Sequence, residues 1–155
     1  MATSITARAD ISVRFIESAP KDRFVIENVG ACAEGALEIE IDLATAPVGL
    51  IFDTTASGAG VEVFQPFEVA AGGDVLAEAI LPTDGDASVQ LSLTGLAPGG
   101  SFAFTVDVDD TGERSDLGQI RVSDAEIAGA SVSINGETAL FGGDAVALLP
   151  SACIS

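Results

Sequence analysis

The amino-acid sequence predicts an all-β fold, a single antiparallel β-sandwich. Apolar residues recur with a period of two along many short runs, and this alternation places one face of a strand against a core. Clusters rich in Gly, Pro, Asp and Asn separate the runs at spacings of about ten residues, as turns between short strands do. Two segments of helical composition, 74–81 and 144–149, are short, and Pro82 stops the first. We expect strands or single helical turns there.

The clearest strand is 37–43, where four aliphatic residues alternate with Glu38, Glu40 and Asp42. The expected strands, in chain order, are 11–15, 24–26, 37–43, 61–63, 89–93, 102–108, 120–122, 132–134 and 146–148. The expected turns between them are 19–22, 55–60, 72–74, 83–86, 98–100, 135–136 and 142–144. The Asn-Gly pair at 135–136 predicts a tight hairpin. A series of about nine short strands is typical of an Ig-like β-sandwich.

The 155 residues suffice for one domain. We expect residues 10–155 to form the sandwich, and residues 1–9 to be either the remnant of a signal peptide or a disordered tail. Ala7 and Ala9 are small residues at the two positions that a signal peptidase inspects, although no apolar run precedes them. No stretch approaches the ~20 apolar residues of a membrane helix.

The charge balance and the absence of certain residue types exclude several kinds of partner and of chemistry. The chain has 6 Lys and Arg against 24 Asp and Glu, a formal charge of -18, which repels nucleic acid and anionic lipid. It contains no His, Trp or Tyr, which excludes imidazole bases, His-ligated zinc and Ser-His-Asp triads. We therefore expect a protein that is not an enzyme, with no nucleic-acid or membrane partner.

The two cysteines, Cys32 and Cys153, lie beside a turn and near the end of the chain, respectively. A disulfide between them would close a long loop, and such bonds persist in oxidising compartments. The alternative is two free buried thiols in a cytosolic protein. A redox or metal site is disfavoured, since there is no Cys-x-x-Cys spacing and no His.

The densest acidic cluster contains Asp107, Asp109, Asp110 and Glu113, at the end of an expected strand. Several carboxylates so close together can supply the six to eight oxygen ligands that Ca²⁺ takes. The alternative interpretation is a solvated face of a very acidic protein. The sequence thus offers these four residues as a candidate calcium site.

A resemblance to known proteins rests on residues 96–113, Leu-Ala-Pro-Gly-Gly-Ser-Phe-Ala-Phe-Thr-Val-Asp-Val-Asp-Asp-Thr-Gly-Glu. This segment resembles the late half of a Calx-beta motif, which implies a calcium-binding β-sandwich with ligands at Asp109, Asp110 and Glu113. The openings ISVRFIESAPKDRF and GAGVEVFQPFEV, with TVDVDDT, are similar to small secreted bacterial proteins labelled "aggregation factor core". That similarity implies an exported protein with a signal peptide.

Together these features predict a secreted or periplasmic, non-catalytic adhesion or matrix module that Ca²⁺ stabilises, with a protein or glycan partner at the cell surface. The alternative is a module that binds a glycan or small ligand, with Phe64 and Phe67 as an exposed binding patch. A carboxylate-based hydrolase is the least favoured hypothesis. Such enzymes usually stack sugars on aromatic rings, whereas the phenylalanines of the expected strands fall on core faces.

Overall fold

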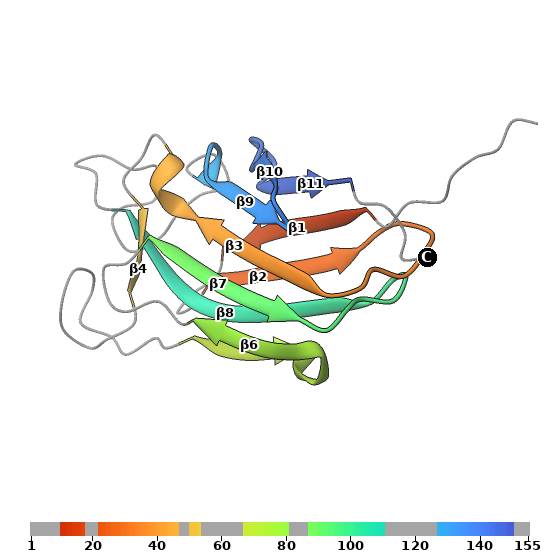
Figure 1. The fold of residues 1–155 in the computed structure, drawn as a ribbon. Coiled ribbons are helices and arrows are strands. Elements are labelled where there is room, and N and C mark those ends of the chain that lie inside the picture. Colours follow the sequence, from red (N-terminus) through yellow and green to blue (C-terminus); the bar gives the residue numbers. More distant parts are fainter. Residues whose placement is uncertain are drawn as a thin grey trace, which may run out of the picture.

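The computed structural model describes residues 10–17, 22–46, 50–53, 67–80, 87–110 and 127–150, without the side chains of Asp53, Asp107, Asp109 and Asp110. Within these residues eleven strands form two antiparallel sheets that pack face to face (Figure 1). This arrangement confirms the predicted all-β sandwich. The N-terminal segment 1–9 lies outside the described residues. In the described part of the chain, no helix is long and apolar enough to span a membrane.

Six strands make the first sheet and five make the second. The six-stranded sheet contains β1 (Ile11–Ile16), β2 (Asp22–Asn28), β4 (Leu50–Asp53), β5 (Glu68–Ala71), β8 (Ser101–Asp110) and β11 (Val146–Leu149). The five-stranded sheet contains β3 (Leu37–Asp42), β6 (Leu76–Ile80), β7 (Ser88–Leu93), β9 (Ser131–Ile134) and β10 (Glu137–Leu140). Two short 3₁₀ turns complete the elements, η1 (Leu43–Thr45) and η2 (Gly73–Val75).

Both long sides of the sandwich are closed by segments that pass from one sheet to the other. The first sheet has the order β11-β1-β2-β8-β4, with β5 also paired to β8, and the second has the order β10-β9-β3-β7-β6. The chain crosses between the sheets from β5 through η2 to β6, and again from β10 to β11 (Figure 1). These crossings tie the two layers together.

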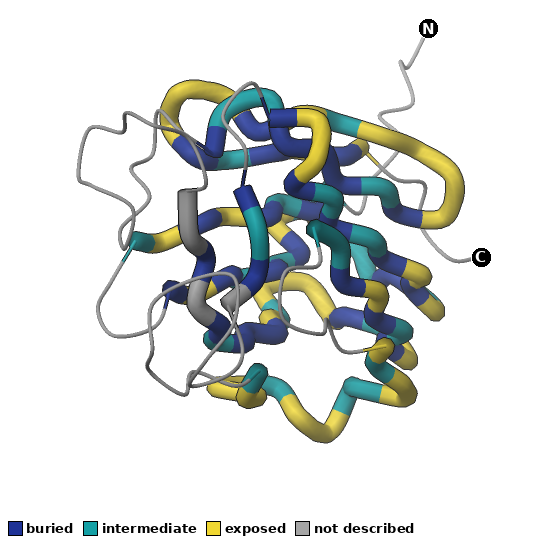
Figure 2. Tube along the Cα trace, turned by 90° about the vertical axis from the view of Figure 1, so that its left-hand side faces the viewer, coloured by how far each residue is buried: buried dark blue, intermediate teal, exposed yellow. Residues whose placement is uncertain are grey.

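The core lies between the sheets and contains a cluster of phenylalanine rings. Phe24 is fully buried, and its ring centroid lies 5.2 Å from those of both Phe15 and Phe104. Phe141 and Phe52 also belong to the cluster, at 6.3 and 6.5 Å from Phe24. Along the core strands, buried positions alternate with half-buried or exposed ones (Figure 2). Burial of one face therefore explains the period of two in the sequence.

The predicted Asn-Gly hairpin connects β9 to β10. Asn135 and Gly136 have φ values of 51° and 90°, the left-handed pair that a type I′ turn requires. The Asn135 side chain also bonds β3 and the residue before it: its Oδ1 accepts the Glu38 amide at 2.8 Å, and its Nδ2 donates to the Ala36 carbonyl at 3.1 Å. This turn thus fixes the hairpin against the neighbouring strand.

Seven of the nine expected strands match β1, β2, β3, β7, β8, β9 and β11, while 61–63 and 120–122 lie outside the described residues. In β11 the expected inward face is wrong: Ala147 and Leu149 are buried, and Leu148 is exposed. Segment 74–81 holds the end of η2 followed by β6, and 144–149 contains β11, so both expectations for these short segments are confirmed. The strands that the pattern did not predict are β4, β5 and β10. All four residues of β5 are exposed, so no core face imposes alternation on them.

Candidate functional site

Pairing between β4 and β8 gathers acidic residues at one end of the six-stranded sheet. The register places Asp53 opposite Asp107, Ile51 opposite Asp109 and Leu50 opposite Asp110. We call Asp53, Asp107, Asp109 and Asp110 the acidic ladder. Three of the four predicted calcium ligands thus belong to it, and Glu113 lies outside the described residues.

The ladder forms because β8 is long and exchanges partners along its length. Residues 101–106 pair with β2 on one edge, whereas on the other edge 103–105 pair with β5 and 107–110 pair with β4. Val106 and Val108 are fully buried in the core, so Asp107 and Asp109 occupy the register positions that alternate with the core positions. The strand that fills the core therefore also carries the aspartates.

Asp22 brings a further carboxylate to the same end of the sheet. It is 2% exposed, and its Oδ2 accepts a hydrogen bond of 2.9 Å from the Val108 amide. The β2–β8 ladder ends at the pair Asp22–Val106, so this carboxylate continues the hydrogen bonding of β8 beyond the end of β2. Sequence reasoning placed Asp22 in a turn and missed this role. The available signal was a polar residue two positions before Phe24, in phase with the alternating residues Phe24 and Ile26.

The electrostatics of the ladder favour a cation. Like charges that face each other across an antiparallel pair are destabilising, and Asp53 faces Asp107 in the register. A hard divalent cation would turn that repulsion into attraction. Among the side chains that the structure describes, no group of three or more acidic or cysteine residues is placed to hold a metal. The ladder side chains are not among those described.

The predicted disulfide partner Cys32 lies in the turn after β2, and it is half-buried. Asn28, which is fully buried, holds this turn: its Nδ2 donates to the carbonyls of Cys32 at 2.8 Å and of Leu96 at 3.0 Å. Its Oδ1 accepts the Gly30 amide at 3.0 Å. Cys153 lies outside the described residues, so the pairing stays a prediction.

Of the predicted aromatic patch, only Phe67 falls within the described residues. It is half-buried, and its ring stacks on that of Phe104 with centroids 4.8 Å apart and an interplanar angle of 28°. Phe67 thus packs against the edge of the core. Phe64 lies outside the described residues.

No protein-family model, curated protein or solved structure matches this chain. Within segment 96–113, the structure shows a turn at Pro98–Gly99 followed by the whole of β8. Its resemblance to a Calx-beta motif remains a prediction from the sequence. The geometry of the described residues is therefore the basis for a functional proposal.

Proposed function

We propose that this protein is an exported, non-catalytic adhesion or matrix module, and that Ca²⁺ stabilises the end of the sandwich that carries the acidic ladder. The observation that carries the proposal is the β4–β8 register, which adds Asp53 to the three aspartates of β8. Asp53, Asp107 and Asp109 occupy register positions of one face of the β4–β8 pair, whereas Asp110 alternates with them. Their carboxylates are oxygen ligands of the type that Ca²⁺ prefers.

The overall charge supports a cation-dependent role outside the cell. A formal charge of -18 produces self-repulsion that weakens the compact state, and bound cations reduce it. Ca²⁺ sites of extracellular modules have dissociation constants on the order of 10⁻⁴ to 10⁻³ M, which suits a calcium-rich exterior. Cation binding would order the ladder and make adhesion through this end dependent on calcium.

Thermal melting with and without Ca²⁺ tests the proposal. At a free Ca²⁺ concentration of about ten times Kd, binding to the folded state adds about 1.4 kcal/mol, which corresponds to a rise in Tm of about 3 to 6 °C. Asp107→Asn should abolish most of the rise. Asp74→Asn, which removes an exposed carboxylate next to β6, should retain it. Melting curves in an equal concentration of MgCl₂, and in matched NaCl, control for the screening of charge by salt. No rise in the wild type at millimolar Ca²⁺ would refute the calcium role.

The strand order supports the predicted disulfide between Cys32 and Cys153. Ile11 of β1 pairs with both Asn28 and Leu149, so β2 and β11 leave the sheet at the same end. These strands are two strand spacings apart, about 10 Å. Each cysteine follows its strand by four residues, a reach of up to about 13 Å. The chain is therefore long enough at both positions for the two cysteines to meet.

Alkylation in denaturant followed by mass spectrometry tests the disulfide on protein exported to an oxidising compartment. We expect no labelled thiol before reduction and two after it. Two labelled thiols before reduction would refute the disulfide and would remove one support for export.

A further inference from the structure

The outer face of the five-stranded sheet carries a groove that lies apart from the acidic ladder. Its volume is about 320 Å³, at the lower end of the range for ligand pockets. Its lining includes Glu38 and Glu40 of β3, Glu78 and Ile80 of β6, and Gln90 and Ser92 of β7.

Strand register explains the shape of the groove. Ser92 of β7 lies between Glu38 of β3 and Glu78 of β6. One row further along the sheet, Gln90 lies between Glu40 and Ile80. The shorter side chain of Ser92 therefore forms part of the floor. The longer side chains of β3 and β6 form two walls about 10 Å apart at the backbone.

Hydrogen bonds hold the β3 carboxylates toward the floor. Ser92 Oγ donates to Glu38 Oε2 at 2.5 Å, and Gln90 Nε2 donates to Glu40 Oε2 at 2.9 Å. Each bond uses one oxygen of its carboxylate, so the other oxygen can accept from a ligand. The wall of β3 thus presents two oriented carboxylates above β7.

The groove combines negative charge with one exposed apolar side chain, Ile80. The five strands of this sheet contain no Lys or Arg, whereas Arg14 and Arg23 belong to β1 and β2 of the other sheet. Ile80 is 58% exposed, and it stands on the same wall as Glu78. A complementary ligand needs a cationic head and an aliphatic stem.

We propose that this groove binds a lysine side chain on an extended segment of a partner protein. The ammonium group would lie above Ser92 between Glu38 and Glu78, and the methylene stem would pack on Ile80. An ammonium carries three donors and no acceptor, which matches a site lined by carboxylate and hydroxyl oxygens.

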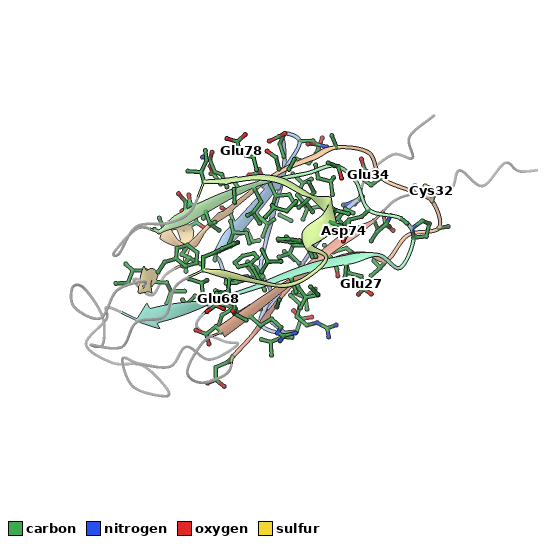
Figure 3. The ribbon with its side chains drawn as sticks, turned by 90° about the horizontal axis from the view of Figure 1, so that it is seen from below. Glu27, Cys32, Glu34, Glu68, Asp74 and Glu78 are labelled. Carbon is green, nitrogen blue, oxygen red and sulfur yellow. The ribbon has the colours of Figure 1, made fainter. Side chains whose placement is uncertain are left out.

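Binding of a fluorescent peptide, followed by anisotropy at low ionic strength, tests the proposal. The probe is an extended Gly-Ser-Val-Lys-Val-Ser-Gly peptide, and its comparison is the same peptide with an acetylated lysine. The groove variant carries Glu38→Gln, Glu40→Gln and Glu78→Gln. The matched control carries Glu27→Gln, Glu68→Gln and Asp74→Asn, and it removes the same charge. Figure 3 shows Glu27 and Glu68 on the opposite side of the sandwich from Glu78.

We expect the groove variant to bind the lysine peptide about tenfold more weakly than the wild type, and the control within about twofold of it. Acetylation of the lysine should weaken binding by about tenfold as well. Melting curves check that both variants remain folded. Equal losses in both variants would show attraction to net charge only and would overturn the proposal, as would no binding to the wild type.

Two further measurements define the class of ligand and the role of calcium at the groove. Free 1,5-diaminopentane that competes at the same concentration as the peptide would assign the groove to a small diamine, which overturns a protein partner. Peptide binding that persists in EDTA supports a groove that acts independently of the proposed calcium site. Peptide binding that disappears in EDTA would overturn the proposal of an independent groove.

Discussion

Gly72, in the crossing from β5 to β6, lies close against the backbone of β8, and its replacement by alanine probes that contact. Its φ is 75°, in the left-handed region. A Cβ added there would overlap the Ser101 carbonyl oxygen and lie 3.1 Å from the Phe102 Cα. Both neighbours are backbone atoms of β8, so they cannot rotate away. Gly72→Ala must therefore push the crossing segment off the sheet or strain it.

Gly99 provides a matched control, because its φ is 78° but an added Cβ there would meet nothing within 4 Å. Left-handed backbone costs a non-glycine residue about 1 to 2 kcal/mol, and both variants carry this cost. Steric overpacking adds about 1 to 3 kcal/mol for Gly72→Ala alone. A difference of about 2 kcal/mol between the variants corresponds to about 4 to 8 °C in Tm.

Differential scanning calorimetry of the two variants and the wild type measures this difference directly. We expect Gly72→Ala to melt well below Gly99→Ala, and Gly99→Ala to melt about 2 to 8 °C below the wild type. Equal melting temperatures for the two variants would refute the close approach of the crossing segment to β8, and with it the seating of β5 on that strand.

Substitutions at three further positions test the packing and the hydrogen bonds. Asp22→Ala removes the acceptor of the buried Val108 amide and should cost about 1 to 3 kcal/mol in urea unfolding, whereas Asp22→Asn, which keeps an oxygen acceptor, should cost less. Equal costs would contradict this role. Phe24→Ala should cost about 3 to 5 kcal/mol in the same assay, because Phe24 contacts four other rings; a cost below about 1 kcal/mol would refute its central position. Asn135→Ala should lower Tm more than Asn135→Gly, since glycine keeps the left-handed φ at the turn; the reverse order would contradict the turn geometry.

The sequence predicts those strands that have one face in the core. In β3, Leu37, Ile39 and Ile41 are buried and the residues between them are not, so burial produces the alternation directly. Edge strands carry a weaker signal. In β10 only Ala139 is half-buried and its neighbours are exposed, so the strand is defined by backbone pairing with β9. Backbone hydrogen bonds produce no pattern in the residue types, so the sequence does not reveal such a strand.

The candidate sites are also predictable from the sequence only in part. Asp107, Asp109 and Asp110 lie close together in the sequence and could be recognised there. Asp53 joins them only through a pairing across more than fifty residues, which depends on where β8 changes partners. The groove is more distant still from any sequence signal, because its walls come from β3 and β6, two strands that meet only through β7. The pattern of residues along the chain does not specify the register between strands that are distant in the sequence.

Isothermal titration of Ca²⁺ into the wild type and into Asp53→Asn tests the central proposal most directly. Asp53 is the ladder member that only the β4–β8 register adds, so its substitution tests both the pairing and the site. We predict one Ca²⁺ per chain with Kd on the order of 10⁻⁴ to 10⁻³ M in the wild type, and binding at least about tenfold weaker in Asp53→Asn. No binding to the wild type, or equal binding to both proteins, would contradict the proposed calcium site.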